Sequence, residues 1–91
     1  MLLYGDQTIG SDALMPRHFE RRNPLDNMAR FYRLELRPTL FGEWSVVRIW
    51  GRIGTRGREH LETHPTRDSA LAAADRLERM KRGRGYRPIT G

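Results

Sequence analysis

The feature that most constrains the fold is the strict alternation of residues 30–37 (RFYRLELR). Tyr32, Leu34 and Leu36 fall on one side of an extended chain, and the residues between them are charged. Successive side chains of a strand point to opposite faces, so the pattern predicts a half-buried antiparallel strand. Such a strand needs neighbouring strands and a second layer that covers its apolar side.

Three more segments are predicted strands. Residues 13–24 form a short edge strand, in which Pro16 is tolerated only at the start or on the edge. Residues 43–50 (EWSVVRIW) form a second long strand, and residues 58–64 (REHLETH) return after a glycine-containing turn. With residues 30–37, these segments predict a small antiparallel sheet.

The last element is predicted to be a helix within residues 65–83 (PTRDSALAAADRLERMKRG). Thr66 is the expected N-cap and Gly83 the expected stop. The apolar residues fall within about half a turn of the helix, as in a helix that covers a core. They are Ala70, Leu71, Ala73, Ala74, Leu77 and Met80. The predicted fold class is therefore α+β, a small antiparallel β-sheet with one C-terminal α-helix packed on one face.

The face of the strand 43–50 that packs against the helix determines which of its side chains are exposed on the other side of the sheet. We expect Val47 and Ile49 to face the helix, which leaves Trp50 and Arg52 on the uncovered side of the sheet. A tryptophan displayed between arginines offers a flat surface for a sugar or base, beside guanidinium groups that suit phosphate. The alternative is that Trp50 stacks with Trp44 under the N-terminal strand or a loop, and the pattern leaves both open.

Length and composition indicate a single domain. We expect a flexible N-terminal tail over residues 1–12, one domain over 13–87 and a C-terminal tail over 88–91. The apolar runs are too short to span a bilayer, the N-terminus lacks the pattern of a secretory signal, and the chain has no cysteine. These features predict a cytoplasmic protein, and association with the nucleoid is compatible with them.

The charge is distributed unequally along the chain. Residues 1–47 have no net charge, whereas residues 48–91 carry the whole net charge of +6. The segment 48–59 (RIWGRIGTRGRE) alone contains four arginines around Trp50. A basic half of this kind favours an anionic partner: nucleic acid first, then an acidic protein or a membrane surface.

Patterns for other chemistry are weak. His60, Glu62 and His64 alternate along one strand, but metal ligands usually converge from more than one element. The glycines near the arginines of 51–58 do not match the phosphate-binding P-loop pattern. No serine has a local base, and no carboxylate pair stands out. We therefore expect no metal, no cofactor and no catalytic activity.

From Asn27 to Tyr86 the chain resembles the WGR domain, named for the tripeptide that here is Trp50-Gly51-Arg52. The resemblance rests on ordered pieces: RFY with RLEL (30–36), WGRIG (50–54), a second glycine, an alanine-rich helix and the basic KRGRGY (81–86). Residues 13–22 match the family's first strand. WGR domains occur in DNA-dependent poly(ADP-ribose) polymerases, in bacterial proteins that resemble a molybdate-metabolism regulator, and in small stand-alone bacterial proteins, which this chain resembles most.

The resemblance implies roles for several residues. In the polymerases the motif tryptophan packs on the sugar at a strand terminus, and the motif arginine contacts the phosphate backbone. By position these roles fall to Trp50 and Arg52, with Arg30 as a second basic contact where the family often has lysine. Gly51 would leave the backbone beside Arg52 uncluttered for a ligand. The further candidate DNA contacts are Arg48, Arg56, Arg58 and, as a looser match, Tyr86.

The sequence departs from the family at a few positions. Arg58 stands where glutamine is frequent, and Met28 and Ala29 replace polar residues. The 91 residues contain no catalytic domain, so we expect no relay to an enzyme in the same chain. The expected function is a DNA-binding module that recognises the backbone, including strand ends or nicks, with a DNA-processing enzyme acting in trans as a further candidate partner. The alternative is a protein-interaction adaptor whose basic aromatic face binds an acidic partner.

Overall fold

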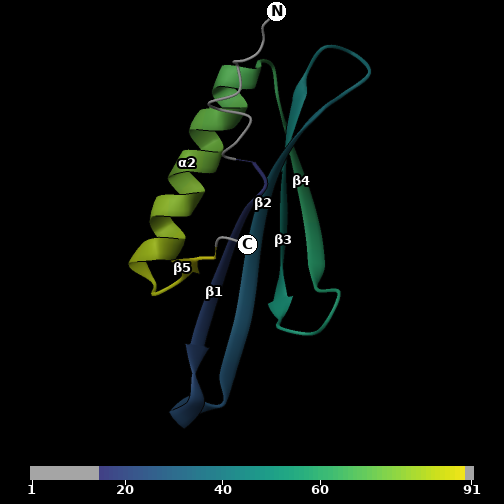
Figure 1. The fold of residues 1–91 in the computed structure, drawn as a ribbon. Helices are drawn as coiled ribbons and strands as arrows, with labels where there is room; N and C mark the ends of the chain where they lie inside the picture. The colour runs from purple at the N-terminus through teal and green to yellow at the C-terminus, as the bar shows by residue number, and fades with distance from the viewer. Residues whose placement is uncertain (1–14, 90–91) are drawn as a thin grey trace, which may run out of the picture.

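The computed structural model describes residues 15–89, which form one sheet and one α-helix (Figure 1). The elements in chain order are β1 (Arg17–Asn23), the short 3-10 helix η1 (Pro24–Asp26), β2 (Met28–Pro38), β3 (Trp44–Arg52), β4 (Arg58–His64), α2 (Arg67–Gly83) and β5 (Arg87–Pro88). The strands are antiparallel, in the order β4-β3-β2-β1-β5, and α2 lies against one face of the sheet. The expected α+β class, with a C-terminal helix on one face, is confirmed.

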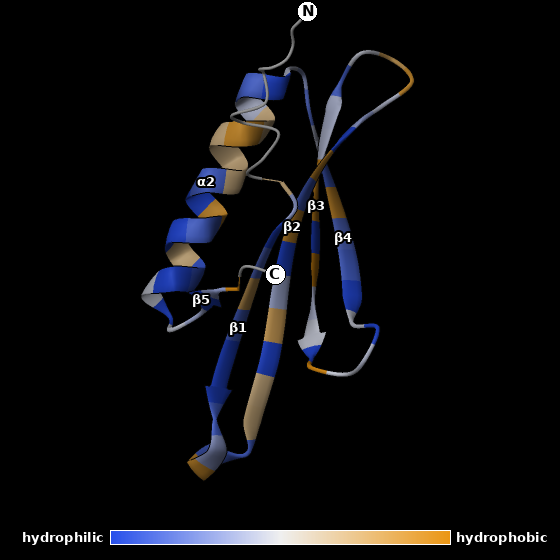
Figure 2. Cartoon of the chain, viewed as in Figure 1, coloured by the Kyte–Doolittle hydropathy of each residue, from blue (hydrophilic) through white to orange (hydrophobic). Residues whose placement is uncertain are grey.

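The start of α2 is set by its capping residues. The Thr66 hydroxyl accepts from the Ser69 backbone N–H at 3.0 Å, and the Ser69 hydroxyl accepts from the Thr66 backbone N–H at 3.2 Å. This reciprocal pair satisfies two backbone donors that a helix start leaves free. Polar residues dominate the outer side of the helix (Figure 2). Among residues 15–89, no helix is long and apolar enough to cross a membrane.

The core lies between α2 and the facing side of the sheet. Ala70, Ala73 and Ala74 are buried, and their small side chains let the helix backbone approach the strands closely. The buried core cluster consists of Phe19, Tyr32, Leu34, Val46, these three alanines and Tyr86. Met15, Leu36, Trp44, Trp50 and Leu77 are partly buried against it. The predicted apolar face of residues 30–37 therefore meets the helix in the core. Of the predicted helix face, Ala70, Ala73, Ala74 and Leu77 pack there, whereas Met80 is 49% exposed and Leu71 is not part of the cluster.

The predicted facing of β3 is wrong. Trp50 pairs with Tyr32, and Val46 pairs with Leu36, so the even-numbered residues of both strands share the α2 side. Directly opposed residues of an antiparallel pair lie on the same face, and a register shifted by one would exchange the faces. Val47 is fully buried on the opposite side of the sheet, where its neighbours are Glu35 and Leu61.

The sheet is longer than the helix that covers it. The β1–β2 hairpin continues past the C-terminal end of α2 (Figure 1). The α2 side of the sheet is therefore split into a covered part and an extension that the helix does not cover. Trp50 and Arg52 lie at this end of β3, before the turn that leads to β4.

The C-terminal segment is tied to β1. Pro88 pairs with Phe19, and the Ile89 backbone N–H donates to the His18 carbonyl at 2.8 Å. The short strand β5 (Arg87–Pro88) thus extends the sheet, and residues 88 and 89, which we expected to belong to a tail, are both held against β1. The expected N-terminal tail over residues 1–12 lies outside the described residues.

Leu77→Ala should lower the free energy of unfolding by about 1–2 kcal/mol, less than for a fully buried leucine, because Leu77 is only partly buried against the core. Urea denaturation of the two proteins measures this difference. Arg76→Ala, on the exposed side of the same turn, should change it by less than about 0.5 kcal/mol. An unchanged stability of the Leu77 variant would contradict the packing of α2 on the sheet.

Candidate nucleic-acid interface

Three arginines lie side by side across the sheet where it passes the C-terminal end of α2; Arg30 and Arg52 are exposed, and the Arg21 side chain lies beside Gly85, just after the helix. Arg21 of β1 pairs directly with Arg30 of β2, and Arg30 pairs directly with Arg52 of β3. Alternate residues of a strand lie on the same face of a sheet. Arg21, Arg30 and Arg52 are each two positions from a residue that packs toward α2, namely Phe19, Tyr32 and Trp50, so all three lie on the α2 side. We call Arg21, Arg30 and Arg52 the basic row. Like charges placed directly opposite each other destabilise a sheet, so the fold itself does not explain this arrangement.

The basic row lacks the acidic partners that other arginines of the chain have. Within residues 15–89, no ion pair involves any of its three members. In contrast, Arg33 pairs with Glu35 at 2.7 Å, and Arg82 pairs with Glu78 at 2.9 Å. Arg76 and Arg79 of α2 also lack an ion pair among the described residues, but only the basic row sets three such arginines directly opposite one another. An unneutralised cluster of this kind suits a surface that binds an anion.

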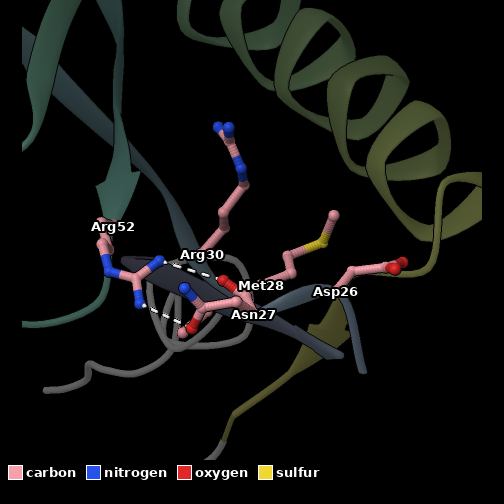
Figure 3. Close-up of a pocket in the computed structure, with 6 residues that line it drawn as sticks. Asp26, Asn27, Met28, Arg30 and Arg52 are labelled. Atoms are coloured by element: carbon pink, nitrogen blue, oxygen red, sulfur yellow. Dashed lines mark hydrogen bonds between the residues drawn. The ribbon is translucent and has the colours of Figure 1, made fainter. Parts of the chain in front are cut away.

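Arg52 also fixes the end of β3 to the β1–β2 hairpin (Figure 3). Its Nη1 donates to the Asn27 carbonyl at 3.2 Å, and its Nη2 lies 3.4 Å from Asn27 Oδ1. Asn27 adopts a left-handed backbone conformation with φ of 53°, which asparagine tolerates better than most residues. A guanidinium has five N–H donors, so Arg52 retains donors for a ligand. Arg30 extends away from this contact, toward the side of α2 (Figure 3).

Trp50 lies next to the basic row, at the border between the covered and uncovered parts of the sheet. Its side chain is partly buried against the core and also lines an open hollow of about 290 Å³, which we call the Trp50 hollow. The residues that line the hollow are Tyr32, Arg48, Trp50, Leu77, Met80, Lys81 and Arg84. Trp50 is thus displayed on the same side as the helix, and among the described residues it makes no ring contact with Trp44.

Two glycines hold the β3–β4 turn close behind Trp50. A Cβ atom on Gly51 would lie 2.8 Å from Gly57 Cα, and one on Gly57 would lie 2.5 Å from the Trp50 carbonyl oxygen. Gly57 also has a φ of +77°, which favours glycine. The expectation that Gly51 leaves open backbone for a ligand is therefore wrong, because Gly57 fills that space.

Tyr32 forms the floor of the Trp50 hollow. It is only 2% exposed, and its hydroxyl has no well-aligned hydrogen-bond partner among residues 15–89. Burial raises the pKa of Tyr32, and the positive charge of neighbouring Arg48 offsets part of this rise. The tyrosine therefore stays neutral around pH 7, so it does not reduce the positive charge of the hollow.

The other predicted contact residues differ in their placement. Arg48 lines the hollow, and Arg58 of β4 pairs directly with Trp50, so both flank the ring. Arg56 is exposed in the β3–β4 turn. Tyr86, in contrast, is 8% exposed, and its ring packs edge-on against Tyr32 with centroids 6.1 Å apart. Tyr86 supports the hollow from the core and does not form part of its surface.

Three basic residues of this surface were not among the named candidate contacts: Arg21, Lys81 and Arg84. Lys81 and Arg84 belong to the basic segment 81–88, which by sequence was either a solvated tail or a phosphate-contacting arm. Arg21 could have been found by counting outward from the β1–β2 turn, since pairing across a hairpin places it opposite Arg30. Lys81 and Arg84 lie at the C-terminal end of α2. Their approach to Trp50 depends on how the helix crosses the sheet, which no local pattern in the sequence specifies.

His60, Glu62 and His64 share one face of β4, as expected from their alternation. His64 Nε2 lies 2.9 Å from Glu62 Oε2. In the part of the chain that the structure describes, no group of three or more His, Cys, Asp or Glu residues is placed to hold a metal ion.

The WGR domain family matches residues 15–91, and the chain therefore belongs to the WGR family. It is 42% identical over 71 residues to the uncharacterized protein y4dW of Sinorhizobium fredii (strain NBRC 101917 / NGR234). That alignment covers 78% of this chain but only 35% of the relative, so the chain spans about a third of that protein's length. No solved structure matches the chain.

Proposed function

We propose that the protein binds DNA through its backbone, with the basic row and Trp50 as the contact surface. The observation that carries this proposal is the directly paired row of Arg21, Arg30 and Arg52, which has no acidic partner among residues 15–89 and adjoins a partly exposed tryptophan. Membership of the WGR family supports it, because the domain is of a nucleic-acid-binding type.

The arrangement suits a phosphate chain that ends at Trp50. The basic row presents three guanidinium groups to successive phosphates, and the indole offers a surface on which a terminal sugar or base packs. These are contacts to phosphate and to a terminal sugar or base, and phosphate contacts carry no sequence information. We therefore propose a preference for strand ends or nicks, with little sequence specificity and no catalytic step.

The proposal is tested by comparing DNA of one sequence in linear blunt, nicked and covalently closed circular forms. Fluorescence anisotropy or gel shift over a series of salt concentrations gives the affinity and its salt dependence. Tighter binding to the linear and nicked forms supports recognition of ends. Equal binding to all three supports backbone recognition alone and refutes the preference for ends.

A second candidate function is an adaptor that binds an acidic protein through the same surface. Among residues 15–89 the basic row forms no ion pair, although Asp26 lines the same pocket as Arg30 and Arg52 (Figure 3). Unpaired positive charge favours any polyanion, including an acidic segment of a DNA-processing enzyme acting in trans. Failure to bind any DNA at low salt would favour this second function over the first.

Trp50→Ala should weaken DNA binding by about 1–3 kcal/mol, because one stacking surface is lost. Since Trp50 also packs on the core, the variant should lose about 1–3 kcal/mol of unfolding free energy. Trp44→Ala is the matched control: Trp44 lies on the same face of β3, is also partly buried, and contacts Arg67 at the other end of the strand. The control should lose similar stability and keep its DNA affinity, whereas equal losses of affinity would contradict a role for Trp50 in contact.

A further inference from the structure

Lys81 is the single lysine of the chain, among 17 lysines and arginines. It lies in the last turn of α2 and lines the Trp50 hollow. Its Nζ is 4.6 Å from the centroid of the Tyr32 ring and 5.3 Å from that of Tyr86. The amine is therefore held at a defined place in the hollow, between two aromatic rings and next to Trp50.

The charged groups around Lys81 come from every element that borders the hollow. Burial lowers the pKa of Lys81, and repulsion by Arg84, Arg48 and Arg30 lowers it further. The two tyrosine rings act in the opposite direction, because their faces attract the ammonium form. Among residues 15–89, no carboxylate pairs with the amine.

A lysine at this place has a property that the surrounding arginines lack. A guanidinium cannot be deprotonated in a protein, whereas a lysine amine in a depressed-pKa environment becomes a nucleophile. The hollow, at about 290 Å³, has room for a small molecule, since one water occupies about 30 Å³. Arg48 and Arg84 in its lining would attract a reagent that carries phosphate.

We propose that Lys81 is a modification site at which small acyl phosphates acylate the amine, and that this modification weakens the binding of nucleic acid. The neutral amine attacks the carbonyl carbon, and a C–N bond forms. The C–O bond to the phosphate breaks, the phosphate leaves with the bonding electron pair, and the nitrogen releases a proton to water. The product is an uncharged amide beside Trp50. The second half of this proposal rests on the proposed function.

The reactivity is tested with acetyl phosphate. The native protein and the same chain unfolded in urea are treated at a series of pH values between about 6 and 10, and peptide mass spectrometry follows Lys81 separately from the N-terminal amine. We expect faster acetylation of Lys81 in the native protein around pH 7–8, with a plateau reached at a lower pH than in the unfolded chain. A native rate at or below the unfolded rate at every pH would overturn the proposal.

The effect on binding is tested with purified acetylated protein and two variants. Lys81→Gln and the acetylated protein should bind duplex DNA about tenfold more weakly at roughly 0.1 M salt, whereas Lys81→Arg, which keeps the charge, should lose much less affinity than Lys81→Gln. Saturating DNA should also protect Lys81 from acetyl phosphate. Unchanged affinity of the acetylated protein would overturn the regulatory half of the proposal.

The acetylation experiment and the DNA-binding experiment together distinguish failure of the reactive site at Lys81 from failure of the proposed DNA-binding function. If Lys81 reacts faster in the native protein but the wild type binds no DNA, the proposed function fails while the reactive site stands. If the wild type binds DNA but Lys81 reacts no faster than in the unfolded chain, the reactive site fails and the proposed function is unaffected.

Discussion

Replacing the whole basic row with glutamine (Arg21→Gln, Arg30→Gln, Arg52→Gln) should weaken DNA binding several hundredfold at roughly 0.1 M salt. Each phosphate contact contributes about −0.9 to the slope of log affinity against log salt, so the slope should become shallower by about 2.7. Two duplexes of unrelated sequence with identical ends should lose affinity equally, because phosphate contacts carry no sequence information. Anisotropy titrations at several salt concentrations measure both quantities.

The same substitutions should leave the protein folded. The row opposes like charges across two strand pairs, and each such pair destabilises the sheet by about 0.2–1 kcal/mol. Arg30→Gln removes both repulsions at once, so the single variant should have a higher free energy of unfolding than the wild type. Salt screens exposed charges, and this gain should therefore shrink in urea denaturations at high salt.

A second triple variant controls for net charge. Arg22, Arg33 and Arg37 lie on the opposite side of the sheet, because each is an odd number of positions from the α2-facing residues of its strand. Arg22 forms an ion pair with Glu20, and Arg33 and Arg37 form ion pairs with Glu35. Changing these three to glutamine removes the same formal charge, but DNA affinity should fall far less. If both triple variants lost affinity equally, general attraction by a basic protein would explain binding, and the basic row would have no special part in it.

The elements of the fold were predictable from local patterns. Alternation over residues 30–37 indicated β2, and the Thr66 cap and Gly83 correctly marked the ends of α2. Each of these signals is contained in a few consecutive residues, because strand pleating, capping and the helical repeat are local geometry.

The facing of β3 was not predictable from periodicity, because both of its sides are apolar. Val46 and Val47 are equally buried, one on each face of the sheet. What decides between them is the β2–β3 connection, in which the Thr39 backbone N–H donates to the Glu43 carbonyl at 2.9 Å. This loop sets Tyr32 opposite Trp50, and a connection longer or shorter by one residue would have reversed the sides.

The side of the sheet on which Trp50 lies affects the candidate site more than it affects the fold. The sequence singled out Trp50, Arg52 and Arg30, and the structure places all three at one end of the sheet. On the predicted face, Trp50 would have stood apart from the helix. On the observed face it shares a hollow with Lys81 and Arg84 of the helix end, and that juxtaposition appears only when α2 is packed on the sheet.

Gly57→Ala should lower the free energy of unfolding by about 2–5 kcal/mol, combining a strained left-handed backbone with overpacking. The new methyl group would lie 2.5 Å from the Trp50 carbonyl oxygen and 2.7 Å from Cζ of Phe31. Backbone must move to make room, and the nearest backbone is that of Trp50 itself. DNA affinity should therefore fall together with stability, as measured by anisotropy on the fraction that remains folded.

Gly42→Ala separates the two causes. Gly42 has a similar φ of +83°, but a Cβ atom there would meet nothing within 4 Å, so only the backbone strain of about 1 kcal/mol applies. The excess loss in the Gly57 variant then measures the close approach of the β3–β4 turn to Trp50. If the two variants were equally stable and both kept full DNA affinity, backbone conformation alone would account for Gly57. The tight packing behind Trp50 would then have no part in positioning the ring.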